Sequence, residues 1–464
     1  MHIIETALLN HFNQCCLRSS QSNSQTSLLT QNDSLIIAFS GGLDSSVLLF
    51  AAIQLYRQNK IPNLAAAHVN HGLQSSSNDW QNHCQQQCDS YQIACYSKQL
   101  NLSQLNKTSE EDARNGRYQF FKELVEDGQT MAFAHHLNDQ VETLLFRLFR
   151  GTGIHGMSGI PASRKLFKGQ LIRPLLDFSR EQLKAYAVDN KLQWIEDPSN
   201  QSSQYHRNFI RNKVVPLIQT KWPKASNSIA NFSLLAKEQV SILDEVAKED
   251  LNQIELTPKT LCLEKLIKLS IARQKNLLHF WIKKKTASPT NGSDIEELIK
   301  QLGLDTEDNN SSDSELKQKQ IEIKISSGFL RSYNGELYFC HQQEPVALTE
   351  KVDWDDLKEN LQLDNGVELT AEFSNENTLQ IRLPKENEKI TVRPRVGGEV
   401  AHPFGRNHST DLKKIYQELK VPPWQRKWLP IIYYNDQIVA VPNVFVDQCM
   451  WLEGDDVGFS VKFD

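Results

Sequence analysis

Residues 35–46 read LIIAFSGGLDSS, and this stretch determines how the rest of the chain is interpreted. Leu35–Phe39 is an uninterrupted apolar run that predicts a buried strand. The glycine pair after it predicts a tight turn, and a helix is expected from Ser45 to about Gln58. A buried strand that passes through a glycine-rich turn into a helix is typical of parallel α/β sheets, which bind ligands at the carboxyl ends of their strands.

Segments beyond this stretch continue the alternation of strand and helix. Polar clusters stand where three of the expected strands end, namely SGGLDS, HVNHG and HHLND, so they would meet at one edge of a sheet. We therefore expect an α/β fold with a doubly wound, mostly parallel, Rossmann-like sheet. The additional strands are predicted at Leu64–Val69, Ile93–Ser97 and Thr130–Ala134, with helices from Ser109 and over Asn138–Arg150.

The turn itself carries the residues of a phosphate site. Gly41 and Gly42 let a ligand approach the backbone closely, and the helix that follows directs its positive dipole end toward an anion. Ser40 and Ser45 add hydroxyl groups, and Asp44 is the candidate ligand for Mg²⁺. The pattern is neither GxxxxGK[ST] nor GxGxxG, which excludes a Walker loop and a dinucleotide fingerprint. A plain glycine turn with an aspartate helix cap is the simpler alternative.

Two acidic residues fall on one face of the helix expected over 138–150. Asp139 and Glu142 are three residues apart, so their carboxylates can hold one ammonium group, and one of them could accept its proton. Acids at this end of a helix also offset its dipole, and that interpretation stays open. Arg114 and Arg207 are candidates for contacts to phosphate or to a carboxylate, with surface ion pairs as the alternative.

The composition is that of an ordinary globular protein with reduced thiols. Of 464 residues, 39% are hydrophobic and 23% are charged, which fits a chain of two to four domains. The longest apolar runs are far too short to cross a membrane, and the N-terminus lacks the features of a secretory signal. The eight cysteines include no CxxC pair, so we expect a cytoplasmic protein without a disulfide framework.

The hydrophobic and charge patterns of the remaining sequence predict several further domains. The middle of the chain predicts one helix over Leu261–Lys285, a polar loop over 303–320 and a hairpin over 321–340 with Asn334-Gly335 as its turn. The expected domains are a catalytic domain over 1–222, a linker helix over 223–245, a mainly helical domain over 246–345 and a small, basic α+β domain over 380–464.

A basic segment lies in the last of these domains. Residues 391–428 hold eight Lys or Arg against three acids, a net charge of +5, although the whole chain carries −5. Trp424 and Trp428 interleave with the basic residues, a pattern typical of surfaces that neutralise phosphates and stack on bases. A solvated basic face beside two core tryptophans explains the same pattern equally well.

The SGGLDS motif resembles the signature of the PP-loop ATP pyrophosphatases, which cleave ATP between its α and β phosphates. Further motifs make the chain similar to the tRNA(Ile)-lysidine synthetases from about residue 35 to 215 and from about 391 to 450. That family often has aspartate where this chain has Asn138. The matching motifs are HVNHGL, EEDARNGRY, AHHLNDQVETLLFRLFRGTGIHGMSGI, IRPLLDFSR, EDPSN, RNFIR, VRPRVGGE and DLKKIYQELKVPPWQR.

The resemblance implies an ATP-dependent ligase that joins free L-lysine to C2 of the wobble cytidine in the CAU anticodon of tRNA(Ile). The base is first adenylated, and the lysidine formed changes decoding from AUG to AUA. The resemblance also implies Mg²⁺ at Asp44, tRNA contacts by the middle and C-terminal domains, and a homodimer. The implied ATP-binding residues are Ser40, Gly41, Gly42, Leu43, Asp44 and Ser45, and the catalytic candidates are Asp44, Asp139, Glu142, Arg114 and Arg207.

Two other functions remain as alternatives. A PP-loop tRNA thiolase would need reactive cysteines, commonly as CxxC near the site, and none lies within residues 134–160. A non-catalytic module that binds ATP or RNA would not need the intact SGGLDS motif together with Asp139 and Glu142. Both alternatives are therefore weaker than the ligase.

Overall fold

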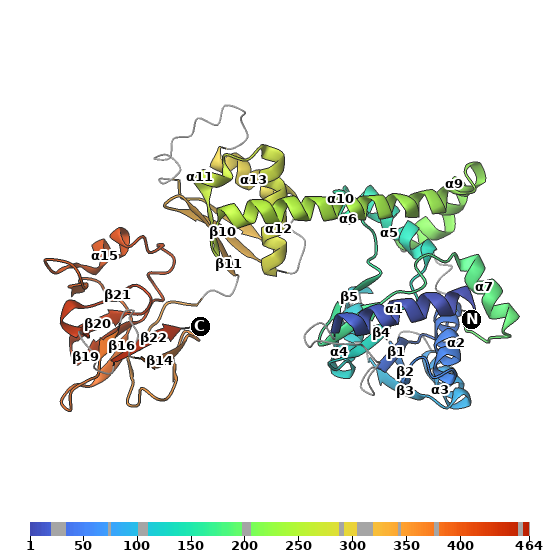
Figure 1. The fold of residues 1–464 in the computed structure, drawn as a ribbon, viewed down its shortest axis with the longest axis horizontal. Coiled ribbons are helices and arrows are strands. Elements are labelled where there is room, and N and C mark those ends of the chain that lie inside the picture. Colours follow the sequence, from blue (N-terminus) through green and yellow to red (C-terminus); the bar gives the residue numbers. More distant parts are fainter. Residues whose placement is uncertain are drawn as a thin grey trace. The chain divides into compact units, whose positions relative to one another are not determined.

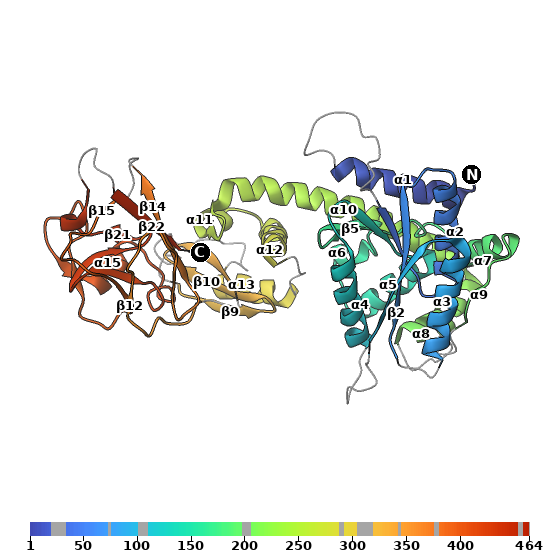
Figure 2. The same cartoon turned by 90° about the horizontal axis from the view of Figure 1, so that it is seen from below.

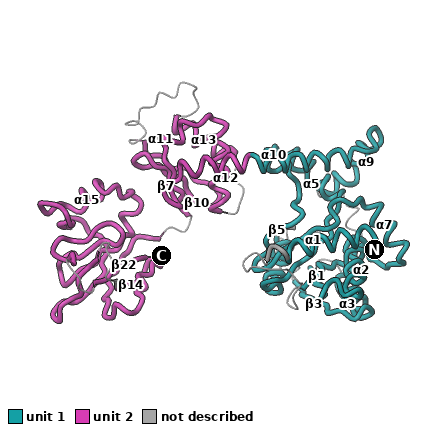
Figure 3. Tube along the Cα trace, viewed as in Figure 1, with its two compact units in different colours: residues 1–242 teal, residues 243–464 magenta. Residues whose placement is uncertain are grey.

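The computed structural model describes residues 1–19, 34–72, 76–100, 110–196, 206–286, 292–303, 319–341, 345–374, 380–452 and 458–463. The chain divides into two compact units, residues 1–242 and residues 243–464 (Figure 3). Within the described ranges, no helix is both long and apolar enough to span a membrane.

A six-stranded sheet forms the centre of the first unit (Figure 1). Its strand order is β3-β2-β1-β4-β6-β5, and every neighbouring pair is parallel except β5 with β6. The doubly wound, mostly parallel sheet predicted from the sequence is therefore confirmed. The strands are β1 (Ser34–Ala38), β2 (Asn63–Asn70), β3 (Ala94–Gln99), β4 (Gln129–Ala132), β5 (Ser163–Leu166) and β6 (Gly169–Ile172).

Helices cover both faces of this sheet, with α4 on the side opposite α2 and α3 (Figure 2). Leu35 and Ile37 of β1 belong to an apolar cluster with α1, α2, α3 and α7, whereas Ile36 belongs to a second cluster with α4. Side chains alternate along a strand, so one apolar run supplies both layers. The helices are α1 (Ile3–Ser19), α2 (Leu43–Arg57), α3 (Ser77–Tyr91), α4 (Glu110–Leu124) and α7 (Arg180–Asp189).

A separate group of helices packs around α5 (Leu137–Phe149), which is followed by the short α6 (Ile154–Met157). Val141 and Leu145 of α5 share an apolar cluster with Ile210 and Val215. The segment 206–221 changes from α-helix to π-helix and back, a distortion often found at functional sites. Its parts are α8 (His206–Phe209), η4 (Ile210–Val214) and α9 (Val215–Lys221).

The long helix α10 (Ala225–Ile254) begins in the first unit and ends in the second, and it contains most of the predicted linker helix 223–245. Its last turns join an apolar core with α12, α13 and a five-stranded antiparallel sheet of order β7-β8-β11-β10-β9. The middle part thus adds a sheet to the helices that were expected. Its elements are β7 (Glu255–Thr257), β8 (Thr260–Cys262), α11 (Leu263–Leu266), α12 (Ile271–Thr286), α13 (Gly292–Leu302), β9 (Glu322–Ile325), β10 (Gly328–Tyr333) and β11 (Glu336–His341).

The single helix predicted over Leu261–Lys285 is wrong. Leu261 lies in β8, which pairs with β11, and the long helix of this region begins only at Ile271. The apolar pattern continued across the break because β8, α11 and α12 all bury side chains in one core. Ser270, whose Oγ accepts a hydrogen bond from the Arg273 amide, carried the capping signal for the true start.

The hairpin predicted over residues 321–340 is confirmed. Strands β10 and β11 pair in antiparallel fashion across Asn334 and Gly335, whose φ angles are 50° and 80°. Both residues therefore adopt the left-handed conformation of a two-residue type I′ turn. The loop predicted over 303–320 lies outside the described residues except at its ends.

Two antiparallel sheets and helix α15 form the last part of the chain, which we call the C-terminal module. The sheet orders are β12-β16-β19-β20-β21 and β13-β14-β22-β15. Because β14 (Glu368–Ser374) pairs with β22 (Gly458–Phe463), the module begins earlier than the predicted boundary at residue 380. The sequence did not predict the first short strands of the module, because the charged residues between 343 and 360 show no sustained alternation of apolar and polar side chains. The other elements are β12 (Val352–Asp353), β13 (Leu361–Gln362), β15 (Ile381–Arg382), β16 (Ile390–Arg393), β17 (Val400–Ala401), β18 (Thr410–Asp411), α15 (Leu412–Glu418), β19 (Ile431–Tyr434), β20 (Gln437–Val441), β21 (Phe445–Val446) and η5 (Gln448–Met450).

Candidate active site

A cavity of about 1110 Å³ opens at the carboxyl ends of β1 and β2 in the first unit. The three polar clusters that the sequence predicts to meet at one edge of the sheet all contribute to its wall. SGGLDS supplies Ser40 and Asp44, HVNHG supplies His68 and His71, and HHLND supplies His136. The prediction that these clusters share one site is therefore confirmed.

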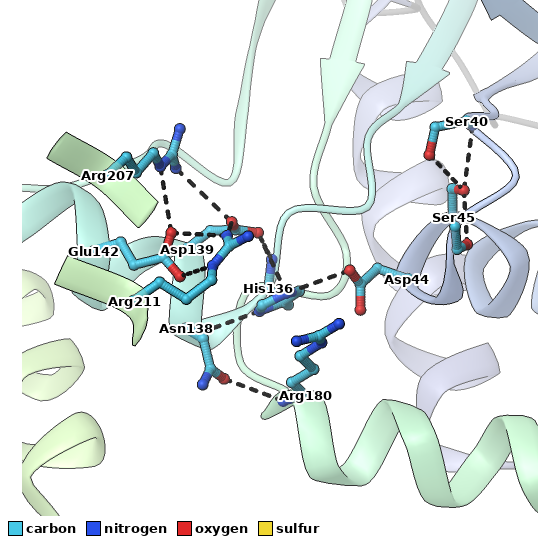
Figure 4. A network of polar contacts seen from close by, with 11 residues as sticks. Ser40, Asp44, Ser45, His136, Asn138, Asp139, Glu142, Arg180, Arg207 and Arg211 are labelled. Atoms are coloured by element: carbon cyan, nitrogen blue, oxygen red, sulfur yellow. Dashed lines mark hydrogen bonds and ion pairs between the residues drawn. The ribbon is translucent and has the colours of Figure 1, made fainter. Parts of the chain in front are cut away.

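The turn after β1 is held in shape by its own hydroxyl groups (Figure 4). Ser45 Oγ donates a hydrogen bond to the Gly42 carbonyl at 3.0 Å and lies 3.0 Å from Ser40 Oγ. Gly42 caps α2 without a side chain, which leaves backbone N–H groups at the helix start for a ligand. Of the residues predicted to bind ATP, Ser40, Gly42, Leu43 and Asp44 line the cavity, whereas Gly41 and Ser45 support the turn from behind.

Gly41 is the residue of this turn whose backbone requires glycine. Its φ is +80°, and a Cβ at this position would lie 3.0 Å from Cys84 Sγ and 3.2 Å from Ile195 Cδ1. Gly41→Ala should therefore destabilise the protein by about 1–2 kcal/mol, measured as a lower melting temperature without ATP. Gly42→Ala is the matched control, because φ there is −78° and the nearest atom to its Cβ would be 3.7 Å away. Equal melting temperatures for the two variants would refute the backbone requirement.

The two carboxylate oxygens of Asp44 differ in their surroundings. Its Oδ1 is buried and has no hydrogen-bond partner among the described residues, whereas its Oδ2 lies 3.5 Å from His136 Nε2. A buried carboxylate oxygen without a partner is costly in free energy. A cation at Oδ1 would remove that cost, so this residue fits the predicted Mg²⁺ site.

Asp139 and Glu142 lie side by side on α5, as the sequence predicts, but two arginines contact both of them (Figure 4). Arg211 donates to the two Glu142 oxygens at 2.6 and 2.8 Å and lies 3.3 Å from Asp139 Oδ1. Arg207 is 3.4 Å from Glu142 and 3.8 Å from Asp139. Since the Glu142 side chain is only 2% exposed, its charge depends on these guanidinium groups.

Sequence reasoning selected Arg207 but missed Arg211. The two arginines are four residues apart in a helical segment, a spacing that places them on one face, and the motif RNFIR carried that signal. Arg211 lines the cavity, while Asp139 and Glu142 are not among its lining residues. The arginine therefore stands between the cavity and the two carboxylates.

His136 is the second residue that sequence reasoning missed. It caps the N-terminus of α5, because its Nδ1 accepts the Asn138 amide at 3.2 Å and its own amide donates to Asp139 at 3.0 Å. Its Nε2 then faces Asp44 at 3.5 Å and Asp139 at 3.6 Å. This imidazole thus connects the phosphate turn to the acid pair. The sequence predicted that the two segments meet at one edge of the sheet but gave His136 no role there.

Arg114 lies away from the groups just described. Its side chain is exposed on α4, with the guanidinium carbon 5.7 Å from the centre of the Tyr118 ring. The α4 arginine that lines the cavity is Arg117. A role for Arg114 in contacting phosphate stays a prediction.

The two adjacent histidines before α5 have opposite environments. Burial and the charge of Arg173 lower the pKa of His135 to about 4, and His135 Nδ1 accepts a hydrogen bond from Arg173 Nε at 3.2 Å. Burial also acts to lower the pKa of His136, but the carboxylates of Asp44 and Asp139 outweigh it, so the pKa of His136 is raised. The two adjacent imidazoles therefore have pKa values shifted in opposite directions.

The free energy of unfolding should depend on pH in opposite senses through these two side chains. The contribution of His135 should grow as pH rises from about 4 to 6.5, because only the unfolded chain binds its proton there. The contribution of His136 should be full below 6.5 and fall as pH rises through its raised pKa. Asparagine keeps an acceptor at the δ position but does not titrate. In urea unfolding, His135→Asn should flatten the acid side of the profile and His136→Asn the alkaline side, and unchanged profiles would contradict both assignments.

Family models match three segments of this chain. They are a PP-loop domain over residues 13–218, a TilS substrate binding domain over 261–338 and a TilS substrate C-terminal domain over 390–460. The tRNA(Ile)-lysidine synthase of Coxiella burnetii is 35% identical to this chain over 436 residues, which is 94% of each protein. The chain belongs to the tRNA(Ile)-lysidine synthase family. The synthase of Serratia proteamaculans is likewise 35% identical, over 89% of this chain and 92% of its own length.

Membership of the tRNA(Ile)-lysidine synthase family confirms the predicted activity. The chain is an ATP-dependent ligase that joins lysine to the wobble cytidine of an isoleucine tRNA and thereby changes its decoding. This chain matches the synthases over nearly their whole length. The match therefore favours the ligase over both the thiolase and the non-catalytic module.

Three cysteines of the first unit, Cys84, Cys88 and Cys95, lie close to one another but do not line the cavity. Burial raises the pKa of Cys84 to about 12, and the hydrogen bond with Cys95, together with burial, raises the pKa of Cys88. The same hydrogen bond lowers the pKa of Cys95. Cys84 and Cys88 are thus buried thiols whose raised pKa values disfavour the thiolate form.

The two tryptophans of the basic segment are packed rather than presented to RNA. Trp428 packs in the two apolar clusters of the C-terminal module and meets Phe463 edge-on at 5.5 Å. Trp424 meets the rings of Tyr333 and Tyr338 edge-on at 6.2 and 5.3 Å. The interpretation of both as structural tryptophans is therefore the better of the two that the sequence left open.

Proposed function

We propose that both steps of lysidine synthesis take place in the cavity of the first unit. The observation that supports this is the position of His136, which joins the phosphate turn to the acid pair. Asp44 Oδ2 and Asp139 Oδ2 lie 3.5 and 3.6 Å from the same imidazole nitrogen. Activation and lysine attack concern the same position of one base, so the groups that serve them need this proximity.

The first step needs a phosphate clamp rather than a protein nucleophile. The C2 oxygen of the cytidine attacks the α-phosphorus of ATP, the bond to the bridging oxygen breaks, and pyrophosphate leaves. The turn from Ser40 to Ser45 and the N-terminus of α2 would hold the phosphates, and Asp44 would hold Mg²⁺ through its unpartnered Oδ1. Magnesium would neutralise negative charge on the leaving pyrophosphate.

The second step needs a site for the ammonium group of lysine. The amine attacks C2 after losing a proton, and AMP leaves. Burial alone would raise the pKa of Asp139, but the charges of His136 and Arg207 outweigh it and lower that pKa. A carboxylate with a lowered pKa is a good anchor for ammonium and a weak base. We therefore assign Asp139 to anchoring alone, and Glu142 both to anchoring and to the role of candidate proton acceptor.

Lysine would have to replace a guanidinium group at these carboxylates. The side chains of Arg207 and Arg211 are 41% and 30% exposed, so both can turn away from α5 without leaving a buried site. Guanidinium groups bind phosphate as readily as carboxylate. Nucleotide or RNA phosphates would thus draw the arginines away and open the acid pair to lysine. Arg114 remains a candidate for a more distant RNA phosphate.

We further propose that different parts of the chain bind different parts of the substrates. The middle and C-terminal parts would hold the body of the tRNA(Ile) while its CAU anticodon enters the cavity, where free L-lysine is consumed. The reaction would take place in the cytoplasm, where its substrates are made. A homodimer is a further expectation, which sedimentation equilibrium tests.

One assay tests the proposed reaction directly. The protein is incubated with ATP, labelled L-lysine and a tRNA(Ile) transcript that carries the CAU anticodon, and label is measured in RNA. We expect one AMP and one pyrophosphate for each lysine joined. A matched transcript with uridine at the wobble position should stay unlabelled. Label in both RNAs, or in neither, would contradict the assignment.

A further inference from the structure

Phe404 and Trp451 form a stacked aromatic pair in the C-terminal module. Their ring centroids are 4.0 Å apart and their planes differ by 13°. The other ring contacts described for this module are tilted or edge-on, at 5.3 to 6.2 Å. Phe404 is 43% exposed, so the stack ends in a phenyl ring that faces solvent. An exposed ring already stacked on one side offers its other face to a third flat group.

Backbone hydrogen bonds hold both rings in place. The Phe404 amide donates to the Val446 carbonyl at 2.9 Å, and the neighbouring His402 amide donates to the Asp447 carboxylate at 2.7 Å. The Trp451 amide donates to the Asp447 carbonyl at 3.1 Å. The residues around Asp447 thus position both halves of the stack. A preformed surface loses little conformational entropy when a ligand binds.

Two basic side chains of the same module, Arg406 and Lys414, lie together at one acidic residue. Arg406, two residues after Phe404, contacts the Glu418 carboxylate at 2.5 Å, and Lys414 lies 4.0 Å from the other oxygen of that group. Arg406 and Lys414 share this carboxylate, and the Asp447 carboxylate supplies the second negative charge, so the two basic side chains are balanced locally. An open aromatic ring that is already stacked on one side, with guanidinium and ammonium donors in the same module, matches a nucleobase with its phosphate better than it matches an apolar peptide.

We propose that Phe404 and Trp451 form a stacking platform for an unpaired base of the tRNA substrate, with Arg406 and Lys414 near the adjoining phosphate. The proposal rests on the proposed function, since that function supplies the RNA. Bases within a tRNA stem are already stacked on their neighbours, so only an unpaired base can reach the platform. In this proposal a base stacks on Phe404 and Trp451, and not on Trp424 and Trp428, for which the sequence suggested base stacking.

Binding of tRNA(Ile) to the full chain tests the platform. Phe404→Ala should weaken the affinity about 10-fold, whereas Phe404→Tyr should keep it because the ring is retained. Phe404→Leu should lose nearly as much as alanine, since a branched apolar side chain cannot stack. Phe373→Ala is the matched control, because Phe373 is 44% exposed in the same module and its contact with Phe459 is tilted at 6.2 Å. Its affinity should equal that of the wild type.

Two further measurements distinguish base stacking from a general effect on RNA binding. Affinity for a blunt RNA duplex should not change with Phe404→Ala, because a duplex offers no unpaired base. The salt dependence of tRNA binding should be unchanged in Phe404→Ala but less steep in Lys414→Glu, which removes a phosphate contact.

Three binding results would overturn the platform. They are wild-type tRNA affinity in Phe404→Leu, an equal loss in Phe373→Ala, and a parallel loss of affinity for the duplex. A changed sedimentation coefficient of RNA-free Phe404→Ala would also overturn it and would mark the pair as a contact between copies of the chain. Lysine incorporation by the wild-type protein is read separately, so a failure of the proposed reaction is not confused with a failure of the platform.

Discussion

Asp44→Asn should reduce tRNA-dependent release of pyrophosphate by about 10²–10³-fold. The buried Oδ1 of Asp44 lacks a partner among the described residues, and a carboxylate in that position binds Mg²⁺ far better than a neutral amide does. Loss of the cation would leave negative charge on the departing pyrophosphate unbalanced. The measurement is pyrophosphate release at saturating ATP and tRNA over a range of Mg²⁺ concentrations, and high Mg²⁺ should restore only part of the rate.

The control for Asp44 must separate metal binding from an effect on the helix dipole. Asp79 is suitable because it is an acid in the first turn of the neighbouring helix α3, is exposed, and is not among the residues that line the cavity. Asp79→Asn should cost a similar, small amount of stability and leave pyrophosphate release unchanged. If Asp44→Asn released pyrophosphate at the wild-type rate, Asp44 would be a helix cap and no metal ligand.

The phosphate turn could be predicted because its information is local. A buried strand, two glycines and a helix start follow one another within twelve residues, and each has a short-range physical signal. The i, i+3 spacing of Asp139 and Glu142 is equally local, so their common face on α5 was predictable. In both cases the backbone conformation alone brings the residues together.

The missing parts of the site depend on contacts between distant segments. Arg211 comes from η4, some seventy residues after the carboxylates that it contacts, and the pairing is possible only because α5 packs against that segment. The crowding that makes Gly41 necessary comes from Cys84 on α3. The membership of β14 in the C-terminal module likewise depends on β22, at the other end of that module. No periodicity within one segment encodes such partners.

Glu142→Gln and Asp139→Asn should each reduce lysidine formation by about 10- to 100-fold. Each amide keeps the shape of the carboxylate but removes the charge that would hold an ammonium group. The loss should appear mainly as a higher lysine concentration at half-maximal rate, with pyrophosphate release much less affected. Glu123→Gln is the matched control, because Glu123 pairs with Lys98 on the surface of the same unit. An unchanged dependence on lysine in both variants would place the lysine pocket elsewhere.

Arg211→Gln should change lysine binding in the opposite direction. Its guanidinium contacts both oxygens of Glu142 and lines the cavity, whereas Glu142 is not among the lining residues. Lysine can therefore reach the acid pair only where this guanidinium is displaced, and removing it should strengthen lysine binding to the RNA-free protein. Turnover should still fall if Arg211 contacts a phosphate once RNA is bound. Calorimetric titration with lysine distinguishes the cases, since weaker binding in both Arg211→Gln and Glu142→Gln would mean that Arg211 positions the carboxylate rather than competing with lysine for it.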